Sequence, residues 1–414
     1  MVEMKDSGAA WIGNIPKAWC VDKLKYHLKR NEPRNPGNQQ VLSLYREYGV
    51  IPKDSRDDNH NITSEDTSKY KYVKKGNFVV NKMKAWQGSV AVSDFEGIVS
   101  PAYYVYEFTG VELDKKFFHY LLRSCYKDEF RRLSGGIREG QWDLPSDALD
   151  NILIVFPEIG KQERIAAFLD VKCLEIDALS EDIQTEIDIL EEYKCSVITE
   201  AVTKGLDSDV EVKDSNVFYL GQVNCNWTLT KIGYVCSKLN RTFEPNDVAL
   251  ICSNKGKVVI RDENVTGIMA SDDNAMQGIK KNDIAIHGMD TWHGAIALSD
   301  YEGKITRVVH VCDSTGDKRF IVYWLQYLAF QGVYKLISNG VRGNTSDFRS
   351  WDKVRNIYIA LPNKEEQKVI CDYLDKLCSE IDAIVNIKKQ QLNVLEEYKR
   401  ATIYEYVTGK KEVI

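Results

Sequence analysis

The sequence lacks several features that would place it in a common functional class. No apolar run is long enough to cross a bilayer, and the acidic start MVEMKD is followed by no apolar segment, so we expect neither a membrane span nor a secretory signal. Ten cysteines occur without a C-x-x-C pair, and none flanks a histidine at metal spacing, which argues against zinc. Free thiols without a signal are typical of the cytoplasm, the compartment we expect.

Motifs of enzymes that act on nucleic acids are also missing. The chain has no (D/N/S)PP(Y/F) loop of a DNA methyltransferase, and Asn35-Pro36-Gly37 does not replace it. Gly160-Lys161 lacks the upstream glycine of a Walker A sequence, and no cluster suits a nuclease. We therefore predict a non-catalytic chain with no catalytic residues, no metal and no cofactor of its own.

The most prominent feature present is a long helical segment that occurs twice. The stretch beginning at Phe156 aligns without a gap with the stretch beginning at Leu361, at an offset of 205 residues. The residues of the first copy that recur in the second include Pro157, Gln162, Leu169, Asp170, Cys173, Glu175, Ile176, Asp177, Ala178 and the run 190–194. Residues 161–203 of the first copy and 363–408 of the second contain no proline or glycine, and these roughly 40 residues predict two helices of about 60 Å.

Apolar residues seven apart indicate that these helices form a coiled coil. The predicted seam residues are Leu169, Ile176, Ile183, Leu190 and Val197 in the first helix and Leu374, Ile381 and Leu395 in the second. Lys388 interrupts the second seam. A whole domain lies between the helices, so we expect an antiparallel pair; the alternative is that each helix packs only on its own domain.

The predicted fold class is therefore α+β, with two tandem α/β domains, each followed by a long helix, related by a pseudo-twofold internal repeat. The predicted boundaries are 1–156 for the first domain, 157–206 for the first helix, 207–361 for the second domain and 362–414 for the second helix and tail. Residues 207–218 are predicted as an acidic linker. One helix is expected in each domain, at 114–132 and 317–337.

Charge alone does not identify a partner. The net charge is −6, but residues 157–206 carry 12 acidic and 5 basic residues, a balance of −7. The acidity therefore belongs mainly to the first helix, which leaves the two domains near neutral.

A second repeat points to binding loops. KKGNFVVNKMKAWQGSVAV, from Lys74, aligns with KKNDIAIHGMDTWHGAIAL, from Lys280, and alternating apolar residues predict strands on both sides of a loop. The methionine, tryptophan and glycine of the loop recur, whereas the polar residues between them change. A fixed frame with variable polar side chains suits two domains that recognise different targets. A metal at His287 and His293 is disfavoured because the first loop has Asn81 and Gln87 there.

The chain's resemblance to the specificity (S) subunit of type I restriction–modification systems implies a DNA target. For such a target, lysines and Arg138 can contact phosphates, Asn81 and Gln87 carry the paired donor and acceptor that suit adenine, and Arg138 can instead pair with guanine. The candidate DNA-binding residues are Lys74, Lys75, Asn81, Lys82, Lys84, Trp86, Gln87, Arg138 and Gln141 in the first domain, and His287, Asp290, Trp292, His293, Arg342 and Asn344 in the second. The alternative is that these are ordinary solvated loop residues, with Trp86 and Trp292 in the core.

With these residues the chain resembles the specificity (S) subunit of type I restriction–modification systems. The resemblance is carried by NKMKAWQGSVAVS…GIVSPAY at 81–103, the GxIPxxW-like openings and the PxxxxQxxIxxFLDxxxxxID helix entries. The second half departs from it, with HGMD for NKMK and TRVV for SPAY.

The resemblance implies two target-recognition domains that each read half of a split double-stranded DNA site. It also implies a coiled coil that sets the distance between the half-sites and binds two methyltransferase subunits. S-adenosylmethionine would be bound by those subunits, and a motor–nuclease (R) subunit can join them. The alternatives are a coiled-coil scaffold that binds only protein, and a diverged DNA methyltransferase or nuclease.

Overall fold

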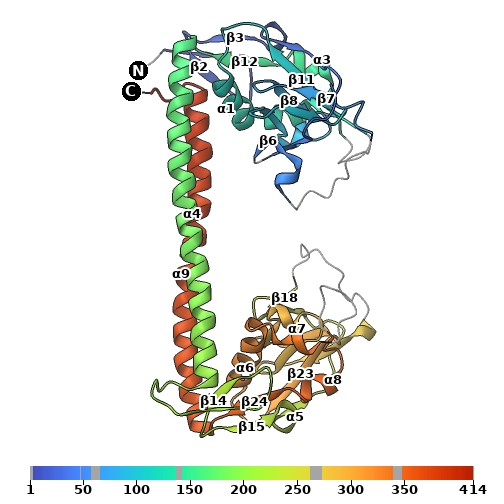
Figure 1. Ribbon diagram of the computed structural model, residues 1–414, viewed down its shortest axis with the longest axis vertical. Helices are drawn as coiled ribbons and strands as arrows, with labels where there is room; N and C mark the ends of the chain where they lie inside the picture. Colours follow the sequence, from blue (N-terminus) through green and yellow to red (C-terminus); the bar gives the residue numbers. More distant parts are fainter. Residues whose placement is uncertain are drawn as a thin grey trace. The chain divides into compact units, whose positions relative to one another are not determined.

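The computed structural model describes residues 3–46, 48–56, 66–136, 142–261, 273–338 and 347–413. Its contacts divide the chain into two units, residues 1–183 with 390–414 and residues 184–389. Each unit contains one domain of strands and short helices, together with part of the long helices α4 (Ile159–Thr203) and α9 (Lys364–Val407) (Figure 1). None of the helices in these ranges has the length and apolar character that a bilayer crossing requires.

The first unit is built on a four-stranded antiparallel sheet in the order β4-β11-β8-β9. Its strands are β4 (Leu28–Arg30), β11 (Tyr103–Phe108), β8 (Phe78–Asn81) and β9 (Val90–Val92). The remaining strands form the pairs β1 (Met4–Asp6) with β2 (Asn14–Pro16), β3 (Cys20–Lys23) with β12 (Leu153–Phe156), β5 (Leu42–Tyr45) with β6 (Gly49–Pro52), and β7 (Lys71–Val73) with β10 (Gly97–Val99). Strands β8 and β9 are the two predicted on either side of the loop, and their apolar residues are part of the buried core.

Short helices cover this sheet. They are α1 (Lys115–Cys125), α2 (Lys127–Leu133), α3 (Ser146–Asp150) and the single turns η1 (Leu24–Tyr26), η2 (Lys53–Ser55) and η3 (Ala85–Gln87). The carboxylate of Asp114 caps α1 by accepting a hydrogen bond from the backbone N–H of Phe117 at 2.8 Å. The single helix predicted at 114–132 is thus two helices, which meet at Tyr126. The ring of Tyr126 is fully buried and its hydroxyl donates to the carbonyl of Leu153, which holds the chain at the break.

The second unit repeats this plan. The sheet order β16-β23-β20-β21 matches that of the first unit, with strands β16 (Cys236–Lys238), β23 (Val309–Ser314), β20 (Ile284–His287) and β21 (Ile296–Leu298). A second sheet has the order β18 (Lys257–Ile260), β17 (Ala249–Ser253), β22 (Gly303–Thr306) and β19 (Met276–Ile279). The remaining strand pairs are β13 (Val212–Asp214) with β14 (Gln222–Asn224) and β15 (Thr228–Lys231) with β24 (Tyr358–Leu361). The predicted linker 207–218 therefore contains a strand.

The helices of the second unit are α5 (Ile232–Val235), α6 (Lys318–Phe330), α7 (Val333–Ile337) and α8 (Trp351–Arg355), with turns η4 (Asp273–Ala275) and η5 (Thr291–His293). The helix predicted at 317–337 is again divided, here at Gly332. Its φ of +66° lies in the left-handed region, which ends α6.

The repeated Pro-x-x-x-x-Gln motif joins each long helix to the domain before it. The buried Gln162 accepts a hydrogen bond from the N–H of Asp114 at 2.8 Å and donates to the carbonyl of Pro157 at 2.8 Å. Gln367 makes the same two bonds, to Asp317 and Pro362. The motif therefore recurs because one buried amide holds the cap of α1, or of α6, against the start of the long helix.

Charged residues show that the long helices run antiparallel. Lys194 pairs with Asp382 at 2.6 Å in the second unit, and Lys399 pairs with Asp177 at 2.6 Å in the first. The two lysines are equivalent in the repeat, as are the two aspartates. Each pair is therefore the pseudo-twofold counterpart of the other, which is the pattern of an isologous interface. The antiparallel coiled coil predicted from the seam is confirmed.

Candidate nucleic-acid interface

The loop between β8 and β9 has a tightly bonded backbone. The side-chain oxygen of Asn81 accepts a hydrogen bond from the N–H of Met83 at 3.2 Å, and the N–H of Ser89 donates to the carbonyl of Lys84 at 3.2 Å. Gly88 ends the η3 turn with φ +90°. Asn81 itself is only 7% exposed. Its amide oxygen therefore serves the turn.

The loop between β20 and β21 has the same frame. The Nδ1 atom of His287 accepts hydrogen bonds from the N–H groups of Met289 at 3.4 Å and Asp290 at 3.1 Å. The N–H of Ala295 donates to the carbonyl of Asp290 at 3.2 Å, and Gly294 has φ +80°. Asn and His both place an acceptor within reach of the second following N–H, which explains how two different residues occupy one position.

Burial lowers the pKa of His287, and the nearby carboxylate of Asp290 opposes this shift. The neutral ring keeps the Nδ1 lone pair available for the two backbone donors. The lowered pKa and the two backbone donors favour the neutral ring, whereas the carboxylate of Asp290, 3.1 Å from the same Nδ1 atom, favours the protonated ring.

The side chains that differ between the loops project from this shared frame. Lys84 is exposed and Gln87 half-buried, and their counterparts are Asp290, half-buried, and His293, exposed. The first loop thus presents a cation and an amide where the second presents a carboxylate and an imidazole. Side chains of such different hydrogen-bonding character would recognise different base edges.

The tryptophan of each loop, Trp86 or Trp292, packs against neighbouring residues and stabilises the loop backbone. The Nε1–H of Trp86 donates to the carbonyl of Met83 at 3.0 Å, and its ring lies 5.5 Å from that of Trp142. Trp292 packs against the second core, with the ammonium group of Lys335 5.2 Å from its ring. Both rings are half-buried, so each retains one accessible portion.

The predicted lysines of the first domain do not form one cluster. Lys82 pairs with Asp143 at 2.7 Å beside the loop. Lys74 and Lys75 lie in the turn that precedes β8, at the other end of this strand from the loop. Arg138, Gln141, Arg342 and Asn344 fall outside the described residues.

A cationic cluster beside Lys82 was missed by the sequence analysis. The guanidinium of Arg30 lies 4.6 Å from the ring centre of Tyr104, and Lys71 lies 5.7 Å from the same ring. Glu32 pairs with both, at 2.7 Å and 3.0 Å. Its hydrogen bonds to Arg30 and Lys71 lower the pKa of Glu32 despite its burial. No local motif indicated this cluster, because Arg30, Lys71 and Tyr104 are distant from one another in sequence.

The predicted seam residues lie on the inner side of the helix pair. Leu169, Ile176, Ile183, Leu374 and Ile381 are buried, and Leu190, Val197 and Leu395 are half-buried. The charged side chain of Lys388, which interrupts the seam, pairs with Glu186 of the other helix. The polar seam position is therefore satisfied across the pair.

Comparisons with known proteins agree on one family. Residues 31–188 match the model of the type I restriction modification DNA specificity domain. A stretch of 120 residues is 24% identical to the type I restriction enzyme EcoDI specificity subunit of Escherichia coli, covering 28% of this chain and 26% of that protein. The matched stretch thus spans about a quarter of the relative's length.

One solved structure shares the fold of this chain. A chain described under complex assembly and conformational transition of the type I R-M system has a TM-score of 0.70 at 15% identity, covering 96% of this chain and 99% of that one. The HsdS subunit from Thermoanaerobacter tengcongensis gives a TM-score of 0.49 at 14% identity, covering 96% of this chain and 98% of that one. At this identity the first match is evidence of a shared architecture.

Proposed function

We propose that this chain is a specificity subunit of the type I restriction–modification family and that it reads a split double-stranded DNA site for partner enzymes. The observation that carries the proposal is the pair of loops, which share one backbone frame and differ at their polar tips. Each loop would contact base edges in one half of the site. The two halves would then differ in sequence because the exposed side chains differ.

In the first domain, Lys84 and Gln87 are the proposed contacts to DNA, with Arg30 and Lys82 as neighbouring cations for the phosphates. In the second domain, Asp290 and His293 take the corresponding places. Asn81 and His287 would act indirectly, by holding the turns. This division follows from which polar atoms are accessible and which are already bonded within the chain.

The chain would supply no chemistry itself. Methyl transfer from S-adenosylmethionine would be performed by two methyltransferase subunits, and cleavage by a motor–nuclease subunit where one joins. The long helices offer a surface for such partners, because several large apolar side chains on them are exposed. They include Leu174 at 69%, Ile189 at 59%, Ile387 at 56% and Val394 at 62%. The ten free cysteines fit a reducing, cytoplasmic setting.

The experiment is a binding assay with the assembled methyltransferase complex and the DNA site identified from its methylation. The double variant Lys84→Ala/Gln87→Ala should weaken binding by about tenfold or more, because a good base contact contributes about 1–3 kcal/mol. The matched control is Lys204→Ala. Lys204 is exposed, belongs to neither loop and forms an ion pair with the neighbouring Glu200 at 3.5 Å, so this variant should bind DNA as the parent does.

The assay also separates the alternatives. Unchanged affinity and unchanged sequence preference in the double variant would contradict the loop assignment. Methyl transfer by the purified chain alone would instead indicate an enzyme, and an assembled complex without any sequence preference would indicate a protein-binding scaffold.

A further inference from the structure

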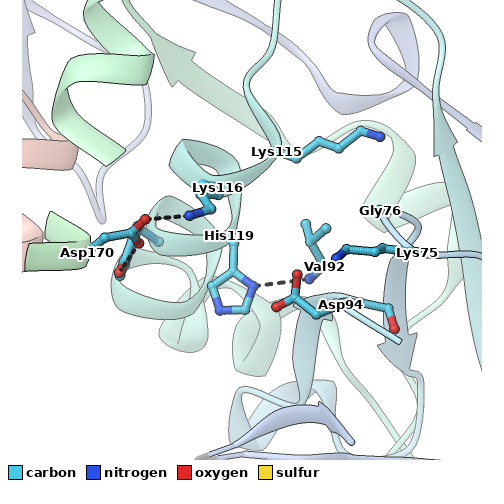
Figure 2. Close-up of a pocket in the computed structure, with 10 residues that line it drawn as sticks. Lys75, Gly76, Val92, Asp94, Lys115, Lys116, His119 and Asp170 are labelled. Atoms are coloured by element: carbon cyan, nitrogen blue, oxygen red, sulfur yellow. Dashed lines mark hydrogen bonds and ion pairs between the residues drawn. The ribbon is translucent and has the colours of Figure 1, made fainter. Parts of the chain in front are cut away.

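A pocket in the first unit lies apart from the reading loop. It has a volume of about 450 Å³ and is formed by the turn before β8, the end of β9, helix α1 and the beginning of α4 (Figure 2). This volume falls in the range of pockets that hold small organic ligands, about 300–1,000 Å³. Its charged side chains are Lys75, Asp94, Lys115, Lys116 and Asp170, and His119 and Tyr120 add polar groups. The carboxylate of Asp94 therefore offsets part of the positive charge of the lysines.

Two of the lysines in this pocket, Lys75 and Lys115, form no ion pair among the described residues. Lys116 pairs with Asp170 at 2.5 Å, and the hydroxyl of Tyr120 donates to the same carboxylate at 2.9 Å, so the charge of Asp170 is balanced within the protein. Among the described residues, Lys75 and Lys115 have no ion-pair partner; Lys115 only lies 5.7 Å from the ring of Phe108. Figure 2 shows this difference, with dashed bonds at Lys116 and none at the other two lysines.

His119 adds a fixed hydrogen-bond donor to the lining. Its Nδ1 atom accepts the backbone N–H of Val92 at 3.2 Å, which leaves the ring proton on Nε2. Burial, with a smaller effect of Arg123, lowers the pKa of His119 to about 4. The ring is therefore neutral at pH 7 and donates through one N–H.

In the second unit, the counterparts of Lys115 and Lys116 are both ion-paired. Lys318, the counterpart of Lys115, pairs with Asp313 at 2.6 Å and donates to the carbonyl of Asn282. Arg319, the counterpart of Lys116, pairs with Asp317, with Asp375 and with Asp372, at 2.7–2.8 Å.

One of the aspartates that pair with Arg319 has no acidic counterpart in the first unit. Ala167 stands at the repeat position of Asp372, and Val322 stands at the repeat position of His119. The unpaired Lys115 and the ring of His119 thus distinguish the first repeat from the second, whereas Lys75 and its counterpart Lys281 both lack an ion-pair partner among the described residues. A role shared by both halves, such as holding the helix pair, does not require them.

We propose that this pocket binds a phosphate group. The ammonium groups of Lys75 and Lys115 would balance its charge, and the N–H of His119 would donate to an oxygen. The side chains of Val92 and Tyr120 would pack against an organic part of mononucleotide size. The phosphate can belong to a free phosphate monoester or to the DNA backbone. The proposal stands on the pocket itself and is independent of the assignment of the reading loops.

The first arm of the test is calorimetric titration of the full chain with inorganic phosphate and with AMP. Lys75→Ala/Lys115→Ala should weaken binding by about tenfold or more, because a hydrogen bond to a charged group contributes about 1.5–3 kcal/mol. The matched control is Lys281→Ala, the repeat counterpart of Lys75, which should bind as the parent does. Both altered lysines are exposed, so circular dichroism should show an unchanged fold.

The second arm measures DNA binding by the assembled complex as a function of salt. If the phosphate comes from DNA, log K should fall less steeply with log salt in the double variant, with a slope smaller in magnitude by about 1–2. The reason is that DNA binding releases about one fewer counterion for each phosphate contact that is lost. A free ligand instead changes the titration and leaves the slope unchanged. Unchanged behaviour in both arms would overturn the proposal. So would a change in the methylated sequence, because the pocket would then belong to the reading surface.

Discussion

Asn81 and His287 act on DNA recognition through the backbone rather than through their own polar atoms. Each accepts backbone N–H groups from the residues that follow, so its acceptor is already used inside the turn. Among the described residues of the two loops, Lys84, Gln87 and His293 keep polar atoms available, whereas the carboxylate of Asp290 lies 3.1 Å from Nδ1 of His287. Base contact and loop shape are therefore separate properties of neighbouring positions.

This separation predicts the effect of Asn81→Ala. The variant leaves the N–H of Met83 without its acceptor, so the free energy of unfolding of the first unit should fall by about 1–2 kcal/mol. Hydrogen exchange at the Met83 amide should accelerate in parallel. Asn81→Asp keeps an acceptor oxygen and should restore slow exchange, whereas equal exchange in the alanine variant and the parent would contradict the role in the turn.

A second residue prediction concerns pH. The pKa of His119 is about 4 in the folded chain, below the usual 6.5, so between these values the unfolded chain binds more protons. Stability should therefore be fully present above pH 6.5 and fall as the pH drops toward 4, by an amount on the order of 2 kcal/mol from this group.

The matched variant is His119→Val, which carries the residue found at this position of the second repeat. Losing the bond from Val92 lowers stability at every pH, but the difference in stability between pH 7 and pH 5 should shrink. Chemical denaturation at the two pH values measures it. Equal pH dependence in parent and variant would show that His119 is not the titrating group.

The long helices follow from the sequence at the scale of the element. Apolar residues seven positions apart predicted the seam, and Leu169, Ile176 and Ile381 of that seam are buried in the structure. The divisions at Tyr126 and Gly332 were not predicted. An aromatic residue gives no local signal of a break, and one glycine within an apolar run can be tolerated. Strand β13 was missed because its three residues are exposed and two of them are charged, and it is defined by its pairing with β14.

The seam predicts a contrast between two positions on α4. Ile176 is 7% exposed, so Ile176→Ala should lower the free energy of unfolding by about 2–4 kcal/mol through lost burial and the cavity left behind. Leu174→Ala, two residues earlier and 69% exposed, should change it by less than about 0.5 kcal/mol. Urea denaturation of the full chain compares them. Equal losses would place the seam elsewhere on the helix.

At the scale of the whole molecule, duplication was the most informative sequence feature. Lys194 of α4 pairs with Asp382 of α9, and their repeat counterparts Lys399 and Asp177 pair in the same way. These ion pairs explain why the lysine and the aspartate recur in both copies. The cluster of Arg30, Lys71 and Tyr104 could not be predicted in this way. Its members come from three strands, and only the pairing of β4 with β11 brings Arg30 to the tyrosine.

The helix pair predicts how the spacing of the DNA site can be altered. One heptad inserted at repeat-equivalent positions in both α4 and α9 keeps the seam in register and lengthens the pair by about 10 Å. The gap between half-sites should then grow by about three base pairs, since one base pair rises about 3.4 Å. Methylation mapping of the variant complex reads the gap. Altered half-sites with an unchanged gap would contradict the role of the helices.

The most direct test of the central claim is methylome sequencing of cells with this chain, without it, and with the 287–293 loop residues placed at 81–87. We predict a split methylated sequence that disappears with the chain. In the loop variant, only one half of that sequence should change. A methylation pattern that persists without the chain, or that is identical in the loop variant, would contradict the account.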